Sequence, residues 1–296
     1  MAGMPARTGA LTGAALIGFA ANSILCRLAL GPRRIDAASF TGIRLLAGAV
    51  ALAILVRLVR MPKETRRSGS WISAAALFGY AAAFSFAYLQ LGAGPGALIL
   101  FGTVQATMIG WGCIRGRRPG LAEGCGIVIA LAGLAALTLP GASAPDKVGS
   151  GLMALAGIAW GVYSLRGHGS TFPLAATADN FARSLPLAGA LVLATLAASH
   201  PSREGVALAV VFGAITSGVC YSLWYAALRR LATTQAAVVQ LSVPLLAALG
   251  GVVLLGETLS MRLIVSGALI LGGVALALKG RTPSPVAGIP RARGAY

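Results

Sequence analysis

Ten uninterrupted apolar runs of about 20 residues each dominate this sequence. Runs of this length can cross a bilayer as helices, whereas the strands of a membrane barrel would alternate over about 10 residues. Only 10% of the 296 residues are charged, far below the share that a water-exposed domain carries. We therefore predict an all-α integral membrane protein with ten transmembrane helices, over residues 8–30, 37–56, 71–91, 94–114, 121–139, 150–168, 173–198, 205–228, 231–254 and 260–279.

The positive charges are distributed unevenly between the connections. Sixteen Lys and Arg residues fall on the side that holds the N-terminus and 5 on the other, with Arg27, Arg44 and Arg183 inside the runs. Because cytoplasmic connections are enriched in Lys and Arg, we expect both termini in the cytoplasm of a bacterial-type inner (plasma) membrane. The net charge of +17 then suits a lipid bilayer with anionic headgroups, and no nucleic-acid partner is expected. Residues 280–296 are expected to form a disordered basic tail.

The two halves of the chain resemble each other weakly. A shift of 139 residues superposes Arg27 on Arg166 and Arg44 on Arg183, and arginine is rare inside membrane spans. With five helices in each copy, residues 8–139 and 150–279, the second copy would enter the membrane upside down. Two such inverted five-helix repeats predict a secondary transporter that works by alternating access.

One motif resembles a known family. The stretch Ala237–Glu257 has a central Pro244, ends in Leu-Gly-Glu, and is similar to the ninth-helix signature of the EamA-like family in the drug/metabolite transporter (DMT) superfamily. The chain length, the two five-helix repeats and the cytoplasmic termini resemble that family along essentially the whole chain. More locally, Trp160–Tyr163 and Tyr221–Trp224 resemble the sixth and eighth helices of the YddG-type amino-acid exporters. The resemblance implies transport of a small solute.

The first half departs from the family pattern. Gln105 lies near the position where a proline would be expected, and Gly116-Arg-Arg118 replaces Gly-Glu. The fourth helix therefore lacks the features from which a break in the ninth is proposed.

Polar and aromatic side chains inside the spans are the candidates for a solute site, because each costs free energy against lipid unless it faces the interior. They fall in spans 1, 3 and 4 and in the repeat mates 6, 8 and 9, which predicts one central cavity. Aromatic walls with a few amide and hydroxyl groups suit a small amphipathic solute, although an aromatic stripe can also serve packing alone. The predicted substrate-binding residues are Asn22, Ser23, Tyr80, Phe84, Gln105, Trp160, Tyr163, Tyr221, Trp224, Gln240 and Ser242.

Three further interior residues have a distinct interpretation. Pro244 removes a backbone donor one turn after Gln240 and is a candidate hinge, with an ordinary tolerated kink as the alternative. Asp179 lies four residues before Arg183 and is expected to pair with it. Arg44 has no such neighbour, so we expect it either to extend toward the membrane surface or to contact a carboxylate in the cavity.

Several function classes are not supported by the sequence. It has no CxxC pair and no His cluster, so neither a metal site nor a cofactor is expected. Asp-rich motifs and a His-Glu-x-x-His run are also absent, so we do not expect an enzyme. The first span has no central carboxylate, where small multidrug antiporters carry their proton-binding acid, which argues against proton–cation exchange by that mechanism.

We therefore predict an exporter of small amphipathic metabolites, with amino acids as the favoured class. Efflux of drugs or lipid-like solutes by the same fold is one alternative, and a membrane scaffold without transport is another. A monomer is compatible with the sequence.

Overall fold

The computed structural model describes residues 6–62, 65, 67–115, 120–138, 144–167, 170–221, 223–224, 240 and 242–279. Within these ranges the regular elements are all helical, which agrees with the predicted fold class. They are α1 (Ala6–Leu30), α2 (Ala37–Leu58), α3 (Trp71–Ala87), α4 (Ala93–Ile114), α5 (Leu121–Thr138), α6 (Lys147–Gly167), α7 (Pro173–Ala194), η2 (Leu196–Ala198), α8 (Arg203–Val211), η3 (Phe212–Val219), α11 (Ser242–Leu255) and α12 (Met261–Lys279). The predicted tail, residues 280–296, lies outside the described residues.

The helices match the ten predicted spans in order, because α8 runs directly into η3 and together they form the eighth. Four of the described helices, α1, α2, α4 and α6, are long and apolar enough to cross a membrane, and α3, α5, α11 and α12 are shorter apolar helices. Large aliphatic side chains face outward, such as Leu121 at 88% exposure and Val253 at 78%. An apolar outer surface of this kind suits lipid rather than water.

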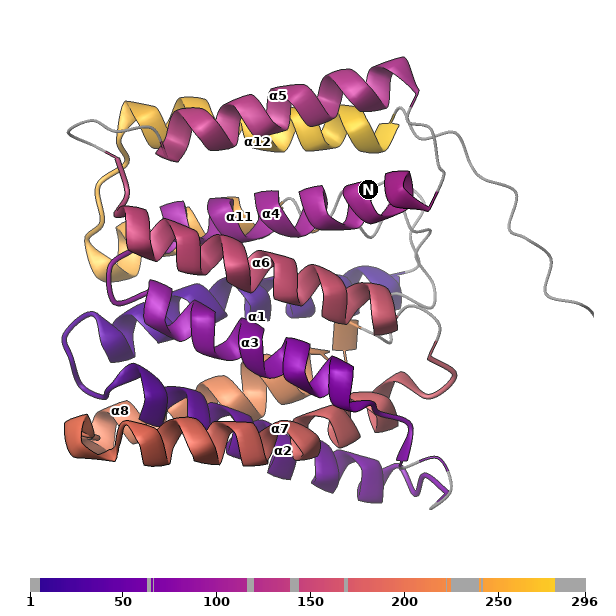
Figure 1. Ribbon diagram of the computed structural model, residues 1–296, viewed down its shortest axis with the longest axis vertical. Helices are drawn as coiled ribbons and strands as arrows, with labels where there is room; N and C mark the ends of the chain where they lie inside the picture. The colour runs from indigo at the N-terminus through magenta and orange to yellow at the C-terminus, as the bar shows by residue number, and fades with distance from the viewer. Residues whose placement is uncertain are drawn as a thin grey trace, which may run out of the picture.

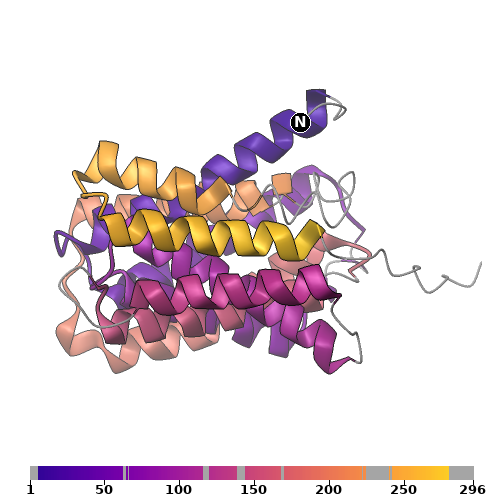
Figure 2. The same ribbon diagram turned by 90° about the horizontal axis from the view of Figure 1, so that it is seen from above.

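The helices lie across the long axis of the bundle (Figure 1). The pair α5 and α12 lies side by side at one end, while α2, α7 and α8 lie at the other, with α1, α3, α4, α6 and α11 between them. Seen from above, the first turns of α1 extend past the neighbouring helices (Figure 2).

Helices from the two halves of the chain pack against each other in matching pairs. The fifth span contacts the tenth (α5 with α12), the second contacts the seventh (α2 with α7), and the fourth contacts the ninth (α4 with α11). Three further contacts each have a counterpart. The contact of α3 with α6 corresponds to that of α8 with α1, and the contact of α6 with α4 corresponds to that of α1 with α11. The contact of α3 with α7 corresponds to that of α8 with α2. If each helix is replaced by its counterpart five spans away, every contact in this set becomes another contact of the set or remains the same.

Glycines make the contact between α5 and α12 possible. A side chain at Gly126 would collide with the backbone of α12 at Gly273 and Ala277, and one at Gly133 would collide with Ile270. Small residues let two helices approach closely in a bilayer, where van der Waals packing rather than the hydrophobic effect drives their association.

The eighth span changes its helical period where it meets α2. The segment η3 is a π-helix, a rare form that occurs mostly in short stretches and often near functional sites. A side chain at Gly213 would collide with the backbone carbonyl of Arg44, so glycine is required for the two helices to touch there. This contact holds η3 against the centre of α2.

The N-terminus of α2 is fixed by an acid. The side chain of Asp36 accepts a hydrogen bond from the backbone N–H of Ser39 at 2.7 Å, as a good N-cap does. It also accepts from the backbone N–H of His200 at 3.2 Å, which ties α2 to the connection before α8. Partial burial acts to raise the pKa of Asp36, but these hydrogen bonds outweigh it and hold the pKa below the ordinary value.

Candidate functional site

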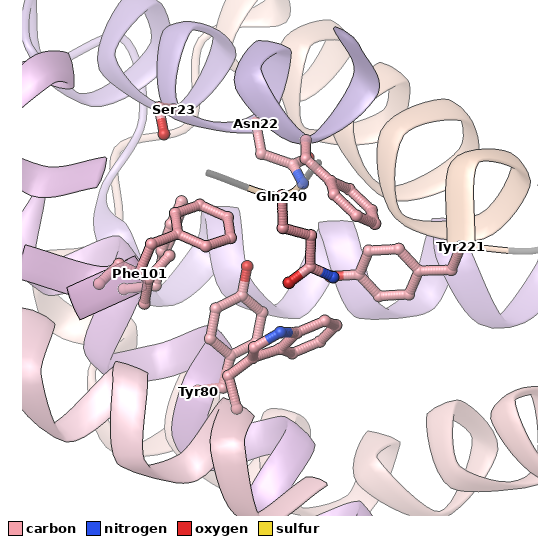
Figure 3. A pocket seen from close by; sticks show the side chains of 10 residues that line it. Asn22, Ser23, Tyr80, Phe101, Tyr221 and Gln240 are labelled. Carbon is pink, nitrogen blue, oxygen red and sulfur yellow. The ribbon is translucent and has the colours of Figure 1, made fainter. Parts of the chain in front are cut away.

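A cavity lies among the central helices (Figure 3), with an empty volume of about 390 Å³ that includes the open space at its mouth. The first half supplies side chains from α1, α3 and α4, and the second half supplies them from α6 and from the eighth and ninth spans. The lining residues are Phe19, Asn22, Ser23, Tyr80, Phe84, Leu100, Phe101, Trp160, Tyr221 and Gln240.

Trp160 joins the aromatic side chains of this wall. Its ring centroid lies 4.8 Å from that of Tyr80, 5.1 Å from that of Tyr221 and 5.5 Å from that of Tyr163. Tilted and edge-to-face pairs at these separations are favourable beyond the apolar area that they bury. The rings of α3, α6 and the eighth span therefore hold one another in place.

Polar groups are few and lie on different sides of the cavity. Gln240 extends toward Tyr221, and the Tyr80 hydroxyl points into the same space (Figure 3). Asn22 is buried, and its side-chain oxygen accepts a hydrogen bond from the Thr216 hydroxyl of η3. An apolar wall with a small number of placed polar groups can bind an amphipathic solute in one orientation.

Seven of the predicted substrate-binding residues line this cavity, and four do not. Tyr163 is 3% exposed and packs behind Trp160, while Trp224 is 7% exposed and packs edge-on against Phe19. Gln105 lines a separate hollow between α4, α5 and α12. Ser242 is half-buried at the start of α11.

Pro244, the candidate hinge, is buried in the first described turn of α11. The described residues do not test a hinge there, and the proposal of one remains a prediction.

Three lining residues are absent from the predicted set: Phe19, Leu100 and Phe101. Phe19 precedes Asn22 and Ser23 by three and four positions, so it shares their helix face. This spacing could have identified Phe19 as a lining residue. Leu100 and Phe101 lie in an apolar stretch of α4 without any distinguishing neighbour.

Arg44 of α2 lies behind the aromatic wall. It is 2% exposed, and its guanidinium carbon lies 5.4 Å from the ring centroids of both Tyr80 and Phe84 and 4.3 Å from that of Phe212. Ring faces stabilise a desolvated cation by about 2 kcal/mol or more, but they do not neutralise its charge as a carboxylate would. Nη1 of Arg44 is buried without a hydrogen-bond partner, and the ion pairs among the described residues do not include Arg44.

Arg183 of α7 has the acid partner that its spacing predicts. Its Nε lies 3.1 Å from Oδ1 of Asp179, which confirms the expected pair, although the N–H is not aligned for a hydrogen bond. The other oxygen of Asp179 accepts the backbone N–H of Gly69 at 2.9 Å. The guanidinium also lies over the ring of Trp71, at 5.5 Å from its centroid.

Where α1, α3 and α11 end and α4 begins, Glu257 links several helices. Its two carboxylate oxygens both lie 2.9 Å from the backbone nitrogen of Ala93, where α4 begins. Nε of Arg27, in the last turn of α1, lies 3.6 Å from Oε1 of Glu257, and Nη1 of Arg27 donates to the carbonyl of Tyr88 at 3.3 Å. The ends of α1, α3 and α11 therefore meet the start of α4 at this carboxylate.

Known proteins are similar to this chain in sequence and in fold. The EamA-like transporter family matches residues 147–279. The uncharacterized protein PA1977 of Pseudomonas aeruginosa is 51% identical over 275 residues, which cover 93% of this chain and 96% of that protein. A crystal structure of a protein with 21% sequence identity covers 90% of this chain and 97% of its own, with a TM-score of 0.62, which shows a shared fold. The chain is a multi-pass membrane protein that belongs to the EamA-like transporter family of the drug/metabolite transporter superfamily.

Proposed function

We propose that this protein is a secondary transporter that exports small amphipathic metabolites, with amino acids as the favoured class, across the bacterial inner membrane. The observation that carries the proposal is the cavity, because residues from both halves of the chain line it. Its stacked rings suit an apolar side chain, and its amide and hydroxyl groups suit the polar part of the same solute.

Alternating access is the mechanism that the helix contacts favour. The matching pairs of helices are those expected if residues 8–139 and 150–279 are inverted repeats related by a two-fold axis. Two such halves can rock about the cavity, so that it opens to one side of the membrane at a time. With both termini in the cytoplasm, the Glu257 end would face away from it, and opening there would separate Arg27 from Glu257.

Flux measurements on the full chain in proteoliposomes test this proposal. We expect saturable uptake of at least one class of radiolabelled amino acid, and a strong loss of that uptake in Trp160→Ala, because Trp160 lines the cavity and contacts the lining rings of Tyr80 and Tyr221. Trp111→Ala is the matched control, since Trp111 is 44% exposed and does not line the cavity. Absence of flux for every amino acid tried would contradict amino-acid export.

Efflux of drugs or lipid-like solutes is the second candidate, favoured by the seven aromatic or aliphatic residues among the ten that line the cavity. A competition panel separates the two functions. If amphipathic drugs inhibit and are themselves carried while amino acids are not, the second candidate is correct. If nothing is carried, a membrane scaffold without transport is the remaining interpretation.

A further inference from the structure

We propose that Arg44 gives the cavity a preference for solutes that carry a carboxylate, by placing an uncompensated positive charge behind the wall formed by Tyr80 and Phe84. This inference rests on the proposed function and names the chemical group that its substrates would share.

The charge of Arg44 is not neutralised by the described parts of the protein. Cations inside a membrane protein are costly and normally pair with an acid, as Arg183 does with Asp179. In the repeat alignment, the position of Asp179 is occupied in α2 by Phe40. The other described acids with defined contacts are engaged away from the cavity wall, with partners Ser39 for Asp36, Gly149 for Asp146, Arg34 for Glu204 and Arg27 for Glu257.

This charge acts on the cavity from a short distance. Tyr80 and Phe84 line the cavity and are also two of the rings over which the guanidinium lies, at 5.4 Å from each centroid. Only the thickness of these side chains therefore separates Arg44 from a solute. Charges interact more strongly through packed apolar groups than through water, because the effective dielectric constant is lower.

The other polar groups of the cavity carry no charge and therefore cannot decide whether it prefers an anionic or a cationic solute. The side chains of Asn22, Ser23 and Gln240 are neutral, and the described lining contains neither an acid nor a base. Arg44 therefore favours a solute whose carboxylate faces the Tyr80–Phe84 wall. A solute with an ammonium group and no carboxylate would be repelled.

Three probes of nearly the same shape test the inference: phenylalanine, 3-phenylpropionate without the ammonium group, and phenethylamine without the carboxylate. Binding to the full chain in detergent is measured by intrinsic tryptophan fluorescence, because Trp160 lines the cavity. We expect phenethylamine to bind about tenfold or more weakly than the two carboxylates. Equal binding of 3-phenylpropionate and phenethylamine, or no binding of any probe, would overturn the inference.

Substitutions assign the preference to Arg44. Arg44→Gln should remove most of the discrimination, and Arg44→Lys, which keeps the charge, should retain it. Arg183→Gln is the matched control and should leave the ratio of probe affinities unchanged, since that arginine is paired with Asp179 and lies over the ring of Trp71, which does not line the cavity. Retention of the wild-type affinity ratio in Arg44→Gln would contradict the inference. If that variant does not fold, the affinity ratio of Arg44→Lys and the wild-type probe series test the inference instead.

Failure of this inference is distinguishable from failure of the proposed function. Flux of amino acids without a carboxylate preference would leave transport standing and reject the role of Arg44. Carboxylate-selective binding without flux would support the role of Arg44 and reject export.

Discussion

Arg44 and Arg183 occupy corresponding positions in α2 and α7, 139 residues apart in the sequence, yet their surroundings differ. Arg183 pairs with an acid one turn earlier in its own helix, and its side chain is 27% exposed. Arg44 is buried among the rings of Tyr80, Phe84 and Phe212, and the ion pairs among the described residues give it no acid. One arginine is neutralised within its own helix, and the other is held by two different helices.

The contrast indicates how two similar halves can serve different purposes. A charge that is paired locally contributes little field elsewhere, and Asp179 is also engaged with the N–H of Gly69 before α3. An unpaired charge beside a cavity acts on whatever enters it. The difference between Asp179 and Phe40 is enough to separate a structural arginine from one that can influence a solute.

The largest expected effect concerns the backbone contact beside Arg44. Gly213→Ala should destabilise the protein by about 3 kcal/mol, because the new methyl group would collide with the Arg44 carbonyl and neither backbone can retreat without repacking. Thermal unfolding of purified protein in detergent measures this. Gly189→Ala in α7 is the control, since an added Cβ there meets nothing within 4 Å. Equal melting temperatures for the two variants would show that the close contact is unnecessary.

An intermediate effect is expected when α2 is given the acid that α7 has. Phe40→Asp places a carboxylate four residues before Arg44, as Asp179 lies before Arg183, and should neutralise its charge. Both Phe40→Asp and Phe40→Asn lose the ring contact with Phe212 and should be similarly destabilised. Only the Asp variant should also lose the preference for 3-phenylpropionate over phenethylamine, by about tenfold relative to Phe40→Asn. The fluorescence assay measures the ratio, and an identical preference in both variants would mean that the charge of Arg44 does not select the solute.

The smallest expected effect concerns Asp36, the acid that α2 does have, eight residues before Arg44 and too far along the helix to pair with it. Asp36→Ala should cost about 1 kcal/mol, because the N-cap of α2 is lost, whereas Asp36→Asn can still cap. The lowered pKa of Asp36 means that its ionised form stabilises the fold above about pH 4, and that this stabilisation is lost as the pH falls through the folded-state pKa.

Unfolding midpoints recorded from pH 7 to pH 3 measure this. The small advantage of wild type over Asp36→Asn should be present at pH 7 and shrink as the pH falls below about 4. If the difference in midpoint between wild type and Asp36→Asn did not change with pH, the charge of Asp36 would not contribute to the cap. In either case the solute preference should not change, since Asp36 lies at the end of α2 and is engaged by the backbone N–H groups of Ser39 and His200.

The order of the ten helices and the spans that meet at the cavity could be predicted from the sequence, because apolar run length and polar interruptions are local properties. The Asp179–Arg183 pair could be predicted as well, since its partners are four residues apart on one helix. For the same reason Phe19 could have been predicted, because it lies on the helix face that holds Asn22 and Ser23.

Which candidate residues share one cavity depends on the packing of the helices and could not be predicted from the sequence. Gln105 faces α5 and α12 rather than the central cavity, and Tyr163 and Trp224 support the wall from behind. Arg44 has an environment built from α3 and η3, which no periodicity within α2 encodes. Helical spacing fixes the side of a helix on which a residue lies, but packing between distant segments decides what that side meets.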